Sequence, residues 1–262
     1  MKRVVDSLLV LCGAAALHAQ TFTTLFSFYG ADGESPFGGL VQATDGNFYG
    51  TTAAGGSPGV GTIFKITSNG TLTTVYSFCS QSGCPDGDWP NVGLLQATDG
   101  NFYGTTYHGG ARGDFGTVFK MTPGGALTTL HTFCSRSGCT DGRYPEAVLV
   151  QGADEYLYGT TRRGGTHDCG TVFKMTTSGK LTTLYSFGSQ AALLDGASPH
   201  AGLVQATNGD FYGTTTRGGA KQFGTVFKIS PGGALTTLYS FCSQSGCQDG
   251  GGPVAGLVQG VK

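Results

Sequence analysis

The stretch GLLQATDGNFYGTT at residues 93–106 decides the fold, because near-copies of it recur at a fixed interval along the chain. Its FYGTT segment contains Tyr103, and the corresponding tyrosines are Tyr49, Tyr158 and Tyr212, at spacings of 54, 55 and 54 residues. Self-similarity with such a period is typical of solenoids, propellers and arrays, in which one supersecondary unit is copied and stacked.

Each unit contains four strand-like runs separated by turn signals. The Asp99-Gly100 pair is typical of a tight hairpin, and the runs are rich in the aromatic and β-branched residues that suit a pleated surface. Beyond the extreme N-terminus, no window of ten or more residues shows apolar residues at helical spacing, so we expect an all-β fold. In the second unit the runs are 93–97, 101–106, 116–122 and 126–133.

Four hairpin-linked strands repeated in tandem are typical of β-propeller blades. Independent sandwiches need about 100 residues per unit, and coils of a parallel β-helix are much shorter. We therefore expect four complete blades, with the GLVQA segment of each unit innermost. Residues 21–28 match a fourth strand and residues 255–260 match a first strand. These flanking segments predict an incomplete fifth blade, or a chain that is the front part of a longer propeller.

The run GLVQATDGNFYGTT at residues 39–52, followed in each unit by GG, GTVFK and LTTLYSF-like segments, resembles the GloVer tandem repeat of predicted secreted bacterial proteins. The resemblance covers the chain after residue 20. It implies a propeller-like, exported protein, and it implies no catalytic residues. Longer relatives often carry a separate C-terminal surface anchor, but no hydrophobic anchor precedes Lys262, so the sequence does not indicate how the protein would be attached to a surface.

Residues 1–19 have the pattern of an export signal, which leaves residues 20–262 as a single repeat domain. Lys2 and Arg3 precede an apolar core at residues 8–17, and Ala19 offers a cleavage site. A buried N-terminal helix is the alternative, and Leu11 argues against lipid attachment at Cys12. The mature chain has no further segment long enough to span a membrane. A formal net charge of −1 argues against a nucleic-acid partner.

Six of the eight cysteines stand in three C-S-x-S-G-C loops, each placed after a fourth strand. In an oxidising compartment this pattern predicts three local disulfides, whereas zinc would require finger-like spacing that no unit provides. The third unit lacks the pair, so the fold does not require it. We interpret the leftover Cys169 as a stray loop thiol rather than a nucleophile. The predicted bonds are Cys79–Cys84, Cys134–Cys139 and Cys242–Cys247.

The loops after the second and fourth strands emerge on one face of a propeller, and these loops differ from unit to unit. Their cations would attract a polyanionic glycan in a salt-dependent way. Alternatively, Trp89 and Tyr107 would stack on a sugar ring, or the loops are merely solvated and Trp89 fills space between blades. The candidate ligand-binding residues are Trp89, Tyr107, His108, Arg112, Arg162, Arg163, His167, Arg217 and Lys221.

Metal binding and catalysis find little support in the sequence. One Asp-Gly pair recurs per unit, but calcium needs six to eight oxygens, so we interpret these pairs as turns and expect no metal or cofactor. No known catalytic motif is present. Paired acids would have to meet across blades, as Asp88 with Glu146 or Asp114 with Asp168. The sequence favours a secreted module that binds an extracellular glycan or protein. The alternatives are a structural surface protein and a polysaccharide hydrolase or lyase.

Overall fold

The computed structural model describes residues 22–260, and each repeat unit forms one four-stranded antiparallel sheet. The predicted signal peptide at residues 1–19 lies outside the described residues. The first sheet contains β1 (Val41–Gln42), β2 (Phe48–Thr52), β3 (Thr62–Ile66) and β4 (Leu72–Ser77), and the second contains β5 (Leu95–Gln96), β6 (Phe102–Thr106), β7 (Thr117–Met121) and β8 (Leu127–Thr132). The third contains β9 (Val150–Gln151), β10 (Leu157–Thr161), β11 (Thr171–Met175) and β12 (Leu181–Ser186), and the fourth contains β13 (Val204–Gln205), β14 (Phe211–Thr215), β15 (Thr225–Ile229) and β16 (Leu235–Ser240).

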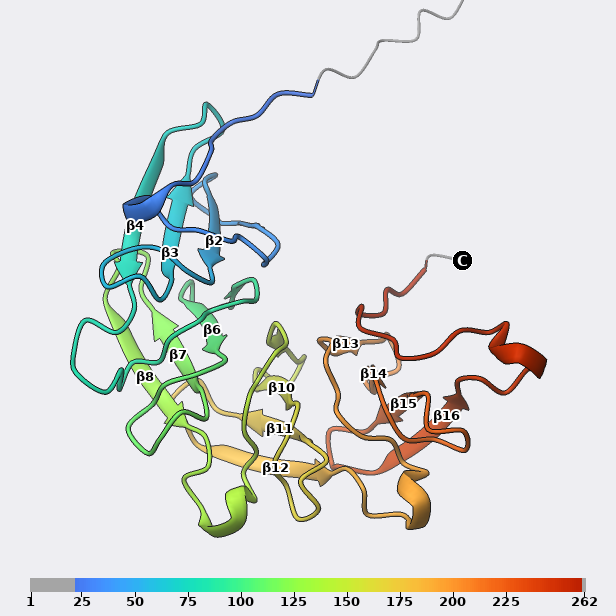
Figure 1. The fold of residues 1–262 in the computed structure, drawn as a ribbon. Helices are drawn as coiled ribbons and strands as arrows, with labels where there is room; N and C mark the ends of the chain where they lie inside the picture. Colours follow the sequence, from blue (N-terminus) through green and yellow to red (C-terminus); the bar gives the residue numbers. More distant parts are fainter. Residues whose placement is uncertain (1–21, 261–262) are drawn as a thin grey trace, which may run out of the picture.

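The four sheets follow one another around a common centre, with β4, β8 and β12 on the outer rim (Figure 1). Helical structure is limited to 3₁₀ turns of three residues: Gly30–Asp32, Ser137–Cys139, Ala191–Leu193 and Ser245–Cys247. The fold is therefore all-β and propeller-like, as the repeat predicts. None of the helical turns in residues 22–260 could cross a membrane.

The first strand of each unit is shorter than the sequence predicts. In the second unit only Leu95 and Gln96 pair with β6, instead of the whole run 93–97. The preceding Gly93 lies against the first unit, where a Cβ atom would meet the carbonyl oxygen of Gly39 at 2.8 Å. Neighbouring units approach each other closely here, so the backbone at Gly93 packs against the first unit and does not extend the pairing of β5 with β6.

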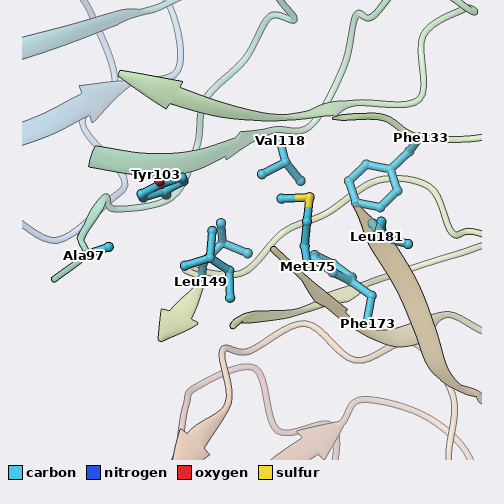
Figure 2. Packing of buried hydrophobic residues seen from close by; sticks show 9 residues of the cluster. Ala97, Tyr103, Val118, Phe133, Leu149, Phe173, Met175 and Leu181 are labelled. Atoms are coloured by element: carbon cyan, nitrogen blue, oxygen red, sulfur yellow. The ribbon is translucent and has the colours of Figure 1, made fainter. Parts of the chain in front are cut away.

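The core lies between consecutive sheets. The second sheet contributes Tyr103, Val118 and Phe133, which pack against residues of the third sheet that include Phe173 and Met175 (Figure 2). Equivalent buried clusters join the first sheet to the second and the third to the fourth. The second and third sheets thus each lie between two neighbouring sheets, which explains why the FYGTT residues of β6 and the LYGTT residues of β10 are buried throughout.

One edge-to-face pair of phenylalanines recurs at every junction between units. The ring at the end of each fourth strand contacts the ring in the third strand of the next unit, a geometry that aromatic quadrupoles favour. The ring-centroid distances are 5.3 Å for Phe78–Phe119, 5.5 Å for Phe133–Phe173 and 5.2 Å for Phe187–Phe227.

The flanking segments lie beside the outer units in the places that the repeat assigns to them. The Phe28 ring packs edge-to-face on the Phe64 ring with the ring centroids 4.8 Å apart, as the phenylalanine after a fourth strand does at the other junctions. Gln259 donates a hydrogen bond to Thr207, at the position of a first strand beyond the fourth unit. Neither segment forms a strand, however, and residues 22–260 contain no fifth sheet.

The recurring Asp-Gly carboxylates close the loops that follow the fourth strands. Asp141 is fully buried and accepts hydrogen bonds from the backbone N–H and hydroxyl of Ser135, and its Oδ2 lies 3.1 Å from His131 Nε2. Burial raises the pKa of Asp141, but these hydrogen bonds outweigh burial and lower the pKa to about 2. Asp195 and Asp249 make corresponding bonds to Ser189 and Ser243. Each of these three carboxylates therefore accepts hydrogen bonds from its own loop and stabilises the loop's conformation.

The three predicted disulfides are confirmed: Cys79–Cys84, Cys134–Cys139 and Cys242–Cys247 are bonded, each across five residues. In the third unit Gly188 stands where the other units have the first cysteine. Cys169 is a free thiol in the preceding loop of that unit, and burial raises its pKa. A Cβ atom on Gly188 would lie 2.9 Å from the Cys169 Sγ.

We expect Gly188→Cys to form a bond to Cys169 in exported, unreduced protein. Gly188 has φ +82°, and the corresponding Cys79, Cys134 and Cys242 adopt φ of 59°, 57° and 61°, so a cysteine fits this backbone. Peptide mapping would detect the crosslink, and Gly188→Ser is the matched control. If position 188 and Cys169 both stay free under oxidising conditions, the close approach of Cys169 to this loop is wrong.

Candidate functional site

The same backbone hydrogen bond joins the loop after the fourth strand of one unit to the loop after the second strand of the next unit. The N–H of Tyr107 donates to the carbonyl of Trp89 at 3.1 Å, and that of Arg162 donates to Tyr144 at 3.0 Å. The corresponding pairs in the outer units are Ala53–Ser35 and Thr216–Ser198. These bonds place the variable side chains of both loops on one face, which we call the variable face.

Trp89 and Tyr144 occupy a backbone conformation that bulky residues rarely adopt. Their φ angles are +54° and +58°, and the same position holds Ser35, Ser198 and Gly252 elsewhere, at +57°, +54° and +63°. A left-handed residue other than glycine costs about 1–3 kcal/mol and persists only where its surroundings fix it. The backbone N–H groups of Trp89 and Tyr144 donate hydrogen bonds to the carbonyls of Val60 and Phe115, which helps to hold this backbone conformation. Large rings therefore stand at a strained position in two adjacent units.

These rings border an open pocket of about 590 Å³, within the range of small-molecule sites. It lies at the junction of the second and third units, and we call it the aromatic pocket. Its lining residues are Trp89, Asn91, Tyr107, His108, Tyr144, Glu146 and Arg162.

The rings of the aromatic pocket support one another. Tyr107 stacks on Tyr144 with centroids 5.1 Å apart, and Trp89 stacks on His108 at 5.3 Å. The Arg143 guanidinium lies 5.4 Å from the centre of the Tyr144 ring, within the range of a cation–π contact. Arg143 is itself held by Asp168 through two hydrogen bonds of 3.2 and 2.8 Å. The platform is thus fixed in position, although the Trp89 side chain remains 44% exposed.

Glu146 supplies a buried carboxylate to the same pocket, with only 8% of its side chain exposed. Its Oε1 accepts a hydrogen bond from Arg162 Nη1 at 3.2 Å. Its Oε2 lies 3.1 Å from His200 Nε2 but forms no hydrogen bond there, so this buried oxygen lacks a hydrogen-bond partner. The Oδ1 of Asn91 is also buried without a partner. Two acceptor oxygens of the aromatic pocket are therefore free to accept hydrogen bonds.

Arg162 also connects the carboxylate to the aromatic platform. Its Nη1 donates to the Tyr107 hydroxyl at 3.4 Å. Burial raises the pKa of Tyr107, and the nearby Glu146 charge adds to this shift, so the hydroxyl stays protonated at neutral pH. The charges of Glu146 and Arg162 offset each other, which leaves the pocket close to electrically neutral.

A second group of polar residues lies beside Trp89 and includes His108, which stacks on the Trp89 ring. His108 Nδ1 is 3.0 Å from Asp114 Oδ2, and the backbone N–H of Gly109 donates to Asp114. Burial raises the pKa of Asp88, and the neighbouring Asp114 charge raises it further. Among residues 22–260, no group of three or more His, Cys, Asp or Glu side chains is arranged to hold a metal ion.

The structure brings four of the nine candidate binding residues together: Trp89, Tyr107, His108 and Arg162 line the aromatic pocket. The other five, Arg112, Arg163, His167, Arg217 and Lys221, do not line it. The cationic patch therefore does not converge on this pocket. Asn91, Tyr144 and Glu146 were missed as binding residues, although a signal existed: they flank Pro90 and Pro145, which follow the strained position in each unit.

The carboxylate pairs considered for catalysis have other partners. Asp88 and Glu146 line different pockets. Asp114 is tied to His108, and Asp168 is tied to Arg143. Asp114, Glu146 and Asp168 therefore each have a charged local partner.

Comparisons with known proteins agree with the repeat and the fold. The model of a family described as the Gloeobacter/Verrucomicrobia repeat matches residues 14–140 and 91–262. No curated protein matches the sequence.

Among solved structures, the extracellular domain of a hybrid two-component system from B. thetaiotaomicron is similar, with a TM-score of 0.53 and 11% identity over 82% of this chain and 24% of that one. A protein of unknown function from Dyadobacter fermentans has a TM-score of 0.50 and 12% identity, and the match covers 80% of this chain and 69% of that one. A candidate gluconolactonase has a TM-score of 0.47 and 13% identity, and the match covers 76% of this chain and 61% of that one. The chain thus spans less than two thirds of the first and last of these structures, and at such identities the likeness concerns the fold alone.

Proposed function

We propose that this chain, which belongs to the Gloeobacter/Verrucomicrobia repeat family, is an exported binding module that holds a neutral glycan on its variable face. One observation carries the proposal: the aromatic pocket combines exposed, pre-positioned rings with buried acceptor oxygens that have no partner. Unsatisfied buried polar atoms are rare in folded proteins, so two acceptor oxygens of this kind in one open pocket call for an explanation. A bound ligand with hydroxyl donors provides one.

A sugar ring matches both features of the pocket. Its C–H face is apolar and can lie on the Trp89 or Tyr107 ring, as large aromatic side chains with fixed orientation allow. Its hydroxyl groups can donate to Asn91 Oδ1 and Glu146 Oε2, which satisfies the two free acceptors. Small-molecule sites usually have this combination of apolar walls and a few placed polar groups.

The charge balance favours a neutral glycan over an acidic one. Arg162, the arginine that lines the pocket, is already paired with Glu146. Placing an anionic sugar here would bring it near a buried carboxylate, and the exposed Arg112, Arg217 and Lys221 lie outside the lining. The salt-sensitive polyanion interpretation of the loops therefore loses its main support.

Export is the second part of the proposal. Three disulfides in one chain are typical of proteins that mature in an oxidising compartment. A glycan outside the cytoplasm is a partner that such a protein would meet. The N-terminal pattern at residues 1–19 points the same way.

A screen of neutral and acidic polysaccharides by affinity electrophoresis, at low and high salt, tests this function. We expect at least one neutral polysaccharide to retard the protein equally at both salt concentrations. The triple variant Arg112→Ala, Arg217→Ala, Lys221→Ala should behave like the wild type, because these cations lie outside the pocket. Binding confined to acidic polysaccharides, and lost in salt or in this variant, would contradict the proposal. A structural role would appear as no retardation by any polysaccharide, and an enzyme would release shorter products.

A further inference from the structure

A second pocket adjoins the aromatic pocket and shares Trp89 with it as a lining residue. It has a volume of about 400 Å³, lies at the junction of the first and second units, and is more apolar; we call it the apolar pocket. Trp89 and His108 line both pockets. Its lining residues include Ser35, Phe37, Ala53, Ala54 and Trp89.

The two pockets are copies of one another, displaced by one repeat. Five lining positions correspond: Ser35 to Trp89, Phe37 to Asn91, Ala53 to Tyr107, Ala54 to His108, and Trp89 to Tyr144. The same backbone bonds hold both sets, as in Ala53 to Ser35 and Tyr107 to Trp89. The fold has therefore placed equivalent hollows side by side and filled them with different side chains.

Trp89 has a different place in each hollow. In the aromatic pocket it occupies the strained position that Ser35 occupies in the apolar pocket, and in the apolar pocket it occupies the position that Tyr144 has in the aromatic pocket. Phe37 adds a second exposed ring to the apolar pocket, with 71% of its side chain accessible. Exposed aromatic residues thus continue from one hollow into the next.

We infer that the two pockets are consecutive subsites and that the ligand is a glycan chain whose neighbouring sugar units lie on either side of Trp89. This inference rests on the proposed function. The polar aromatic pocket holds one unit through hydroxyl contacts, and the apolar pocket holds the next through ring stacking on Phe37. A monosaccharide would occupy one subsite and leave the other empty.

Two variants address the apolar pocket without touching the aromatic pocket. Phe37→Ala removes an exposed ring, and Tyr29→Ala, at a side chain that is 86% exposed and lines neither pocket, is its control. Ala54→Arg fills the apolar pocket. Arginine fits this backbone position, because Arg163 and Arg217 occupy it in the third and fourth units with the same pairing to the preceding loop.

The experiment measures affinities of 1→4-linked gluco-, manno- and xylo-oligosaccharides of one to six units by calorimetry. We expect affinity to rise with length beyond one unit, by roughly three- to tenfold for the second subsite. Phe37→Ala and Ala54→Arg should remove this gain and leave monosaccharide binding unchanged, whereas Tyr29→Ala should change nothing. Equal affinity at all lengths, or a length gain that both variants retain, would overturn the inference. If no sugar of any length binds, the proposed function itself fails.

Discussion

Replacing Phe119 with alanine is expected to lower the free energy of unfolding by about 3–5 kcal/mol, the usual cost of deleting a fully buried phenylalanine. The Phe119 side chain is inaccessible to solvent, and its ring packs against the Phe78 ring of the preceding unit with the ring centroids 5.3 Å apart. Its loss would open a cavity at the junction between the first and second units, which the close-packed core cannot fill. Chemical denaturation followed by circular dichroism measures the change.

Leu238→Ala is the control for this substitution. Leu238 also lies in a strand, β16, but 48% of its surface is exposed, so we expect a loss below about 1 kcal/mol. If Phe119→Ala were as mild as Leu238→Ala, the cores would not lie between the sheets, and the propeller-like arrangement would be wrong.

Replacing Trp89 with serine is expected to weaken binding of the neutral glycan by at least about thirtyfold, or roughly 2 kcal/mol, as for a dominant aromatic contact. Stability should change little, because serine already occupies this backbone position as Ser35 and Ser198. The substitution removes the ring that both pockets share. Calorimetry measures the affinity, and thermal denaturation measures the stability.

Tyr156→Ser, in the turn between β9 and β10, provides the matched control. Tyr156 is a partly exposed ring beside the Lys174 ammonium group, outside both pockets. Its loss should leave glycan affinity within the error of the measurement. A Trp89→Ser protein that folds normally and binds as tightly as the wild type would contradict the assignment of the site.

The repeat made the fold predictable, because four near-identical units report the same strands and turns independently. The runs ending in FYGTT and GTVFK formed β6 and β7 as predicted, and the cysteine loops bridged as predicted. The short first strand was not foreseen, since the close approach of Gly93 to Gly39 is a contact between units. Such contacts leave no periodic pattern within one unit.

The candidate site was predictable only in part, for a related reason. Differences between units identified Trp89, Tyr107, His108 and Arg162 as variable-face residues. The five other candidates were grouped with them because loop membership alone does not say which side chains converge. The pairing of Glu146 with Arg162 joins residues 16 positions apart, and His200 approaches from the next unit. That convergence depends on how the units are arranged around the centre.

Trp89 is the only tryptophan of the sequence, so its fluorescence reports on the shared wall of both pockets without any label. The most direct test of a glycan-binding variable face is therefore a titration of the wild-type protein with the neutral oligosaccharides that calorimetry shows to bind. We expect a saturable change in tryptophan emission and reduced quenching by acrylamide, both with the affinity that calorimetry gives. Saturable glycan binding that leaves the emission and quenching of Trp89 unchanged would contradict it.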